Sequence, residues 1–190
     1  MFRSLVVGAA ACAAVMLGMA ADTASSPRNL IINGGFEEGK DAPTGWRFSS
    51  ARMEDFEHGF THDAANGRRA AHIVCRSDAM SGYWGQTVRV KPHTRYRLTL
   101  KVKLESGKVL IYAHGKTLNQ RLYLNTAHEN PLVPVFVPVK WTAGVVETNR
   151  WLDQMMEFDS GDETAITVSF GTYFKTGTVS FDDVELHEIQ

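Results

Sequence analysis

Cysteine is scarce in this sequence, with two residues in a chain of 190. Cys12 lies in an apolar N-terminal stretch, so a chain that has lost this stretch keeps Cys75 alone and forms no internal disulfide. An exported domain without disulfides must be held together by its core or by a bound metal. Because Cys75 ends the apolar run 70–74, we expect a buried side chain rather than a reactive thiol.

The sequence also lacks an excess of charge of either sign. It has 20 Lys and Arg against 21 Asp and Glu, for a net charge of -1. This balance gives no electrostatic reason to expect nucleic acid or an anionic membrane as a partner. After the first twenty-odd residues, no stretch approaches the ~20 apolar residues that span a bilayer. We therefore expect no membrane insertion once the N-terminal stretch has been removed.

The N-terminal stretch is typical of a secretion signal. Arg3 supplies a positive charge, residues 5–20 are apolar, and Gly18 and Ala20 suit a cleavage site. We expect residues 1–24 to be a signal peptide, and the mature protein to be secreted, periplasmic or at the cell surface. Lipoprotein processing at Cys12 is the alternative, although no leucine stands three places before it and the apolar run continues past it.

Helical periodicity is nearly absent, and short alternating runs recur between Gly, Pro, Asn and Asp. In residues 96–104 apolar and polar side chains alternate, which predicts a half-buried strand. The predicted strands cover residues 30–32, 70–75, 83–90, 96–104, 109–112, 121–124, 133–142, 152–158, 164–170 and 179–186. Residues 58–69 are polar and predict a long loop. About ten strands in one domain, residues 27–190, predict an all-β sandwich.

Four motifs occur in a characteristic order along this domain. Residues 29–37 read NLIINGGFE ahead of Gly45 and Trp46, residues 86–92 read QTVRVKP, Trp151 and Phe158 follow, and residues 177–184 read GTVSFDDV. In this order they resemble the bacterial carbohydrate-binding modules grouped around families 4, 9 and 22. The resemblance implies a galactose-binding-like jelly-roll β-sandwich of two antiparallel sheets. It also implies a non-catalytic protein whose partner is a polysaccharide or glycan.

The resemblance further implies a structural calcium ion that ties the first strand region to the last. It assigns Glu37 and Asp182 to this site, and calcium needs about six to eight oxygen ligands, so backbone carbonyls must complete the shell. Gly35 and the turn 66–68 are the expected carbonyl donors. Strict alternation would turn Asp182 away from Asp183. The alternative makes Glu37 and Asp182 ordinary turn and edge carboxylates.

Strict alternation along the predicted strand 179–186 also predicts which side chains share a face. Val184 and Leu186 would share the face of Asp182, and Phe181 and Glu185 would lie on the opposite face.

Aromatic side chains are the candidate sugar platforms, because a flat ring covers the apolar C–H face of a pyranose. The candidates are Tyr83, Trp84, Tyr112, His114, Tyr123 and Trp141. Trp84 follows a Gly turn and is the leading candidate, while Trp46 and Trp151 match positions that are structural in the family. For each aromatic residue, packing in the core is the alternative.

Signals of catalysis are weak. His58 and His62 stand four apart but lack a third ligand at a recognised spacing. Nothing in the sequence places two carboxylates face to face, as glycoside hydrolysis requires. A basic stripe of Arg95, Arg97, Lys101 and Lys103 lies on one polar strand face, which predicts a solvated surface; an anionic glycan partner is the alternative. An envelope domain that binds a protein partner and a small secreted hydrolase or lyase remain as alternative functions.

Overall fold

The computed structural model describes residues 28–125, 141–145 and 149–189, and of residues 141–145 the backbone only. The predicted signal segment and Cys12 lie outside the described residues. Within these ranges, no helix has the length and apolar character to cross a membrane.

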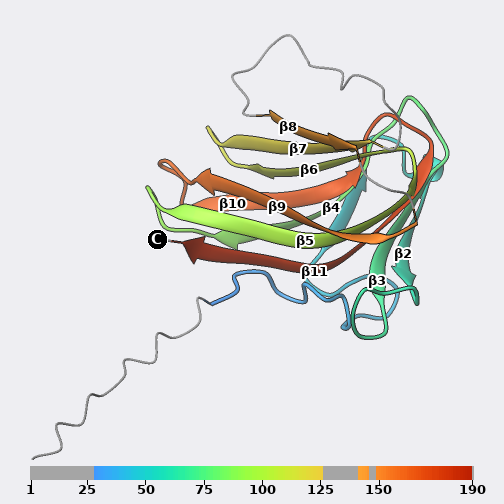
Figure 1. Ribbon diagram of the computed structural model, residues 1–190, viewed down its shortest axis with the longest axis horizontal. Helices are drawn as coiled ribbons and strands as arrows, with labels where there is room; N and C mark the ends of the chain where they lie inside the picture. Colours follow the sequence, from blue (N-terminus) through green and yellow to red (C-terminus); the bar gives the residue numbers. More distant parts are fainter. Residues whose placement is uncertain (1–27, 126–140, 146–148, 190) are drawn as a thin grey trace, which may run out of the picture.

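The described chain forms eleven strands in two stacked sheets, which confirms the predicted β-sandwich (Figure 1). The six-stranded sheet has the order β1 (Arg47–Ser50), β4 (Gly82–Arg89), β10 (Ala165–Thr172), β6 (Lys108–His114), β7 (Asn119–Asn125), β8 (Trp141–Val145). The five-stranded sheet has the order β2 (Phe56–Thr61), β3 (Ala70–Cys75), β11 (Gly177–Ile189), β5 (Arg95–Ser106), β9 (Trp151–Asp159). A single 3-10 turn, η1 (Met53–Asp55), precedes β2. The pairs are antiparallel except β7 with β8, which are parallel.

The core lies between the sheets and takes alternating side chains from most of the described strands. Phe170 of β10 and Phe181 of β11 bring the two sheets together, with ring centroids 4.5 Å apart. Trp46 lies 5.0 Å from Phe170 and 5.4 Å from Phe36. The NGGFE opening therefore contributes Phe36, which is completely buried, to the centre of the sandwich.

Trp84 belongs to this core, so the prediction of an exposed sugar platform at Trp84 is wrong. Its side chain is 1% exposed, its ring lies 5.3 Å from that of Phe48, and its Nε1–H donates to the His72 carbonyl at 3.4 Å. The reason is the strand period of two: Trp84 shares a face with Gln86 and Val88, which are buried.

A β-bulge in β11 overturns the second expectation, that of strict alternation. The register with β5 shifts between Asp182 and Glu185, and Asp183 has a φ of 49°. Phe181 faces the core before the bulge, and Val184 faces the core after it, together with Leu186. The extra residue thus resets which side chains point inward.

The N-terminal edge also differs from the expectation. Residues 30–32 form no strand, although the Leu30 N–H donates to the Leu186 carbonyl at 2.9 Å. β1 and β2 were not predicted, because neither shows clean alternation, and β2 takes four residues of the expected loop 58–69. The predicted strand 133–142 lies outside the described residues except at its end, where β8 begins.

Glu163 joins two turns at one end of the six-stranded sheet. Its Oε1 accepts the Thr117 N–H at 2.6 Å, the Thr117 hydroxyl at 3.1 Å and the Leu118 N–H at 3.2 Å. A Cβ on Gly115 would overlap the carboxylate, so the turn after β6 wraps it tightly. These backbone N–H donors, Thr117 first and Lys116 second, lower the pKa of Glu163 to about 2.

Trp84→Ala is expected to lower the free energy of unfolding by about 3–5 kcal/mol, the scale for truncating a buried Trp. Phe174→Ala is the matched control, because its ring is 51% exposed and its loss should stay within about 0.5 kcal/mol. Chemical denaturation of both variants checks this. Equal losses for the two variants would contradict the core position of Trp84.

Glu163→Gln is expected to destabilise the protein at neutral pH and progressively less in acid. A carboxyl group with a lowered folded pKa contributes stability above its unfolded pKa, and that contribution is lost as the pH falls through the folded value. The difference in Tm between the wild type and the variant should therefore shrink between about pH 4.5 and about pH 2. A difference that stays constant over this window would exclude the charge as its cause. Glu54→Gln at an exposed position serves as the control.

Candidate functional site

The outer face of the six-stranded sheet gathers most of the predicted sugar-binding residues. Phe170, Ile111 and Leu122 point into the core, so their strand neighbours point outward. Three rows of paired residues cross this face. They are Tyr83, Gly171, Leu110, Tyr123; Gly85, Ser169, Tyr112, Arg121; and Thr87, Thr167, His114, Asn119.

The aromatic side chains of these rows touch one another. Tyr83 meets Tyr112 edge to face, with centroids 5.2 Å apart, and Tyr112 stacks on His114 at 4.9 Å. A second chain of contacts joins Tyr123 to Tyr173 at 5.1 Å and Tyr173 to Phe174 at 4.9 Å. We call the set Tyr83, Tyr112, His114, Tyr123, Tyr173 and Phe174 the aromatic face.

Small residues of β10 leave room for the rings of the neighbouring strands to meet above the sheet. Ser169 and Gly171 are buried between β4 and β6, and a Cβ on Gly171 would overlap the Gly82 carbonyl oxygen. Tyr83 and Tyr112 come from the two flanking strands, and their rings meet above Ser169 and Gly171. The result is a nearly continuous aromatic surface from β4 to β6.

The polar groups of the aromatic face are neutral hydrogen-bonding groups at neutral pH. Burial raises the pKa of Tyr83, that of Tyr112 and, to about 12, that of Tyr123, so their hydroxyls stay protonated. Burial, followed by the charge of Arg121, lowers the pKa of His114. A neutral imidazole offers one donor and one acceptor. Such groups suit the hydroxyls of a sugar.

A depression of about 320 Å³ adjoins one end of the aromatic face. His114, Thr87 and Thr167 connect it to the sheet, and Lys116 and Glu163 line its far side. Oε1 of the Glu163 carboxylate is already held by the turn after β6, which fixes the position of this side chain in the lining.

Four of the six predicted binding residues are thus brought together, and the structure adds others. Trp84 is excluded by burial, and the side chain of Trp141 lies outside what is described, although its backbone pairs with Arg121. Sequence reasoning missed Tyr173 and Phe174, whose signal was two adjacent aromatics directly after a strand. Phe174 has a φ of 43° and is half exposed.

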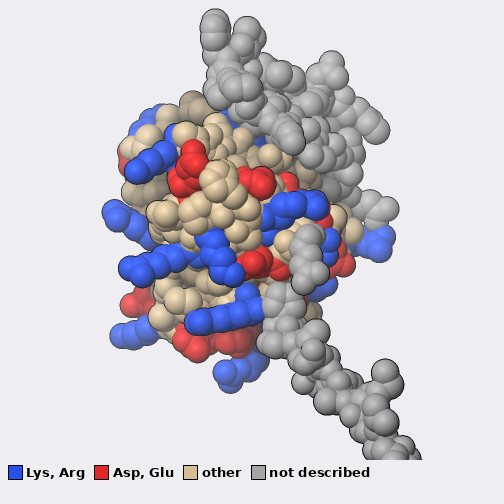
Figure 2. Space-filling model, turned by 90° about the vertical axis from the view of Figure 1, so that its left-hand side faces the viewer, with Lys and Arg blue, Asp and Glu red and all other residues tan. Residues whose placement is uncertain are grey.

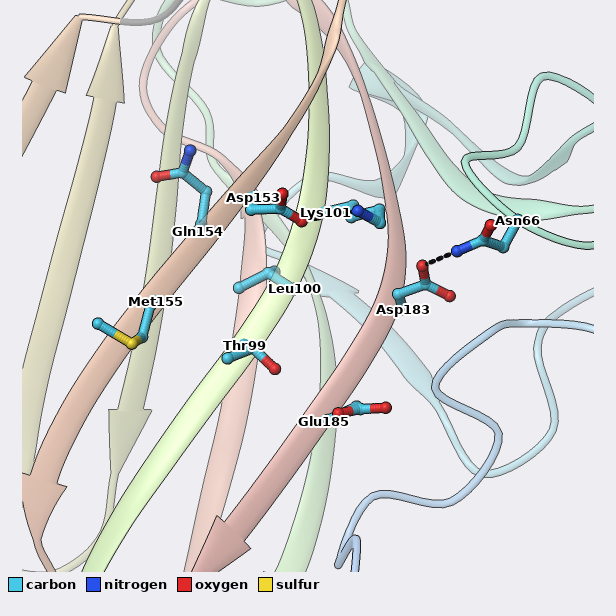
Figure 3. Close-up of a pocket in the computed structure, with 9 residues that line it drawn as sticks. All are labelled: Asn66, Thr99, Leu100, Lys101, Asp153, Gln154, Met155, Asp183 and Glu185. Atoms are coloured by element: carbon cyan, nitrogen blue, oxygen red, sulfur yellow. Dashed lines mark hydrogen bonds and ion pairs between the residues drawn. The ribbon is translucent and has the colours of Figure 1, made fainter. Parts of the chain in front are cut away.

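The opposite face, on the five-stranded sheet, carries a larger depression of about 550 Å³ (Figure 3). Part of its polar lining is paired: Lys101 pairs with Asp153 at 2.7 Å, and Asn66 donates to Asp183. No aromatic side chain lines it. This depression therefore offers no stacking surface to a sugar.

The predicted basic stripe lies on this sheet and is neutralised by neighbouring acids. Arg95 and Arg97 pair with Glu157 at 3.0 and 2.6 Å, and Lys103 pairs with Asp63. Figure 2 views the end of the sandwich where β11 terminates, and cationic and anionic side chains are interspersed there as well. The expectation of a solvated polar face is confirmed.

The two predicted calcium ligands converge on one loop. Asp182 is fully buried, and its Oδ2 accepts the Ala65 and Asn66 N–H groups at 2.9 and 3.0 Å. Glu37 Oε1 accepts the N–H groups of Arg68 and Arg69 at 2.6 and 2.9 Å. The chain ends and residues 65–69 therefore meet, as the predicted site requires.

These two carboxylates fit the acidic part of a calcium site. Asp182 Oδ1 accepts only the Asp183 N–H, at 2.8 Å, and Glu37 Oε2 only approaches Arg68, at 3.6 Å, so each carboxylate keeps an oxygen with spare acceptor capacity. Burial raises the pKa of Asp182 despite its backbone donors, and a cation would offset that desolvation. Gly35 lies at an open position.

A metal site made of side chains alone is not found. Among the described residues, no three His, Cys, Asp or Glu side chains are grouped to hold a metal ion. Backbone carbonyls would have to complete the calcium shell, and calcium remains a prediction. The pair His58 and His62 gains no third ligand, and His58 instead stacks on Phe48 at 4.1 Å.

No protein-family model and no curated protein sequence matches this chain. Its fold matches solved structures over most of its length. A family 61 carbohydrate-binding module in complex with β-1,4-galactotriose gives a TM-score of 0.53 at 22% identity, over 85% of this chain and 99% of that one. The CBM22-1 xylan-binding domain from Paenibacillus barcinonensis Xyn10C gives 0.56 at 14%, over 88% and 98%.

A longer protein contains the same fold as one part. The enzymatically active domain of bacteriophage CBA120 tailspike protein 4 gives a TM-score of 0.57 at 14% identity, and the match spans 85% of this chain but only 21% of that one. Structures of families 4 and 16 match over 84% and 83% of this chain. The predicted resemblance is thus confirmed as one of fold: the chain has the jelly-roll architecture of carbohydrate-binding modules.

Proposed function

We propose that the protein is a secreted, non-catalytic carbohydrate-binding module that holds a polysaccharide or glycan on the aromatic face. The observation that carries the proposal is the contact of Tyr83, Tyr112 and His114 on one sheet face, together with the exposed ring of Phe174; Tyr123 is 7% exposed and supports this face through Tyr173. Sugar recognition combines aromatic stacking with a few polar groups. This face supplies both.

The roles on this face differ with exposure. Phe174 presents a half-exposed ring at the end of the contact chain through Tyr173, so it suits stacking against a pyranose. Tyr112 and His114 occupy the centre, where their polar atoms suit the ring hydroxyls. The solved modules with this fold include one bound to galactotriose and one named as xylan-binding, which supports a glycan as the ligand class.

The described strands of the six-stranded sheet offer no pair of carboxylates to a glycan on the aromatic face. Glycoside hydrolysis needs two carboxylates roughly 5–9.5 Å apart across the substrate. None of the described strands of the six-stranded sheet contains Asp or Glu, and Glu163 at its end is held by backbone donors. An envelope domain with a protein partner is the competing function, and it would bind no glycan.

Phe174→Ala and Tyr112→Ala are expected to weaken glycan binding about tenfold each, which corresponds to about 1.4 kcal/mol of lost contact. A glycan array followed by calorimetry on the best binder measures this. Met155→Ala is the matched control, because Met155 is 58% exposed on the other sheet. Unchanged affinity in both aromatic variants, or failure of the wild type to bind any glycan, would overturn the proposal.

We include a structural calcium at Glu37 and Asp182 in the proposal. Removing calcium with a chelator should lower the Tm, because a ligand bound only by the native state stabilises it by mass action. Glu37→Gln should reduce this shift. An unchanged Tm in excess chelator, on protein shown by metal analysis to have carried calcium, would exclude the site.

A further inference from the structure

The two sheets differ sharply in the charges that their strands carry. The strands of the six-stranded sheet contain Arg47, Arg89, Lys108, His114 and Arg121, and neither Asp nor Glu. The strands of the five-stranded sheet carry the acids Glu57, Glu105, Asp153, Glu157, Asp159, Asp182, Asp183, Glu185 and Glu188. The five-stranded sheet also carries Arg95, Arg97, Lys101 and Lys103, so the two sheets differ in the position of the acids and not of the cations.

Arg121 lies beside the aromatic face, on β7 at the end of the row that contains Tyr112. It pairs in register with Tyr112 on β6, its Nε donates to Asn119 Oδ1 at 2.8 Å, and its Nη1 lies 3.4 Å from the Tyr123 hydroxyl. Both partners are neutral. Among the described residues, Arg121 has no carboxylate partner, and these two contacts use two of its five N–H donors.

Other partly buried cations of the described residues are held differently. Lys101 and Lys103 of β5 each pair with an acid, and Arg69 donates to the backbone carbonyls of Glu37 and Gly39. A half-buried guanidinium with neutral partners has lost solvent without gaining a counter-charge. Asn119 and the Tyr123 hydroxyl hold its position, so the remaining donors are fixed rather than mobile.

The nearest acids do not pair with Arg121. Glu163 and Asp162 line the adjoining depression, where Glu163 accepts the N–H groups of Thr117 and Leu118 and Asp162 lies 3.1 Å from His93. Arg121 is close enough to His114 to lower the pKa of that imidazole. Arg121 therefore keeps a positive charge that no acid among the described residues pairs with.

We propose that the ligand of the aromatic face is an anionic glycan, whose carboxylate or sulfate groups are bound by Arg121. This rests on the proposed function. Arg121 lies on the strand next to that of Tyr112, roughly 4.8 Å across the sheet. A sugar ring placed over Tyr112 therefore directs an exocyclic acidic group over Arg121. Planar guanidinium forks bind carboxylate and other oxyanions through two parallel hydrogen bonds.

The test compares four polymers on the same protein: polygalacturonate, a sulfated galactan, neutral β-1,4-galactan and neutral xylan. We expect the wild type to bind an acidic polymer at least tenfold more tightly than the neutral ones, and binding to weaken as NaCl rises from about 50 to about 500 mM. Preference between the first two polymers identifies the anionic group as carboxylate or sulfate.

Variants assign the preference to Arg121. Arg121→Gln should weaken binding of the acidic polymer about tenfold or more and leave the weak binding of neutral polymers unchanged. Lys101→Gln, which removes a cation from the opposite sheet, should change neither. Thermal melting of each variant verifies folding, and the salt dependence of the wild type tests the inference if Arg121→Gln does not fold.

The outcomes separate this inference from the function on which it rests. Equal or tighter binding of a neutral polymer, without salt dependence, would refute the anionic ligand while the aromatic face stands as a sugar site. Acidic binding that is unaffected by Arg121→Gln would remove Arg121 from the site. Binding to none of the polymers, and to no glycan on an array, would overturn the proposed function as well.

Discussion

The packing of Phe170 between the two sheets is the constraint on which the binding face depends. Its ring contacts Phe181 of the opposite sheet and Trp46 of the N-terminal segment, so β10 cannot turn over without emptying the core. Because side chains alternate along a strand, Ser169 and Gly171 must then face outward. These small residues leave room for the flanking tyrosine rings to meet. The chemistry of the outer face is thus fixed by an interaction on the inner face.

The last strand carries a second constraint, which ties the chain ends to the 65–69 loop. The bulge at Asp183 lets Phe181 and Val184 both face the core, although an unbroken strand would send them to opposite faces. Asp182 is left on the outer side, where backbone N–H groups of the loop cover it. Glu37, near the N-terminal end of the domain, accepts two backbone N–H groups of the same loop. Core packing and loop closure therefore depend on one inserted residue.

The sequence was sufficient for the fold class and for most of the aromatic face, since both follow from strand alternation and the order of motifs. The prediction for Trp84 was wrong because it relied on the position after a Gly turn. Strand alternation, which puts Trp84 on the same buried face as Gln86, was the stronger signal. The bulge at Asp183 was not predictable, because it adds no residue type that alternation would reject. Tyr173 was missed because contacts with Tyr123 come from a strand far away in sequence.

The difference between the two outer faces follows from how their charges are satisfied. Exposed ion pairs contribute little to stability, about 0–1 kcal/mol each, so the pairs around Glu157 and Asp153 do not explain the fold. Their effect is to leave the five-stranded sheet with few free donors. The six-stranded sheet excludes acids from its strands and keeps Arg121 among neutral partners. A face that combines fixed rings with an uncompensated cation is suited to a ligand that brings its own negative charge.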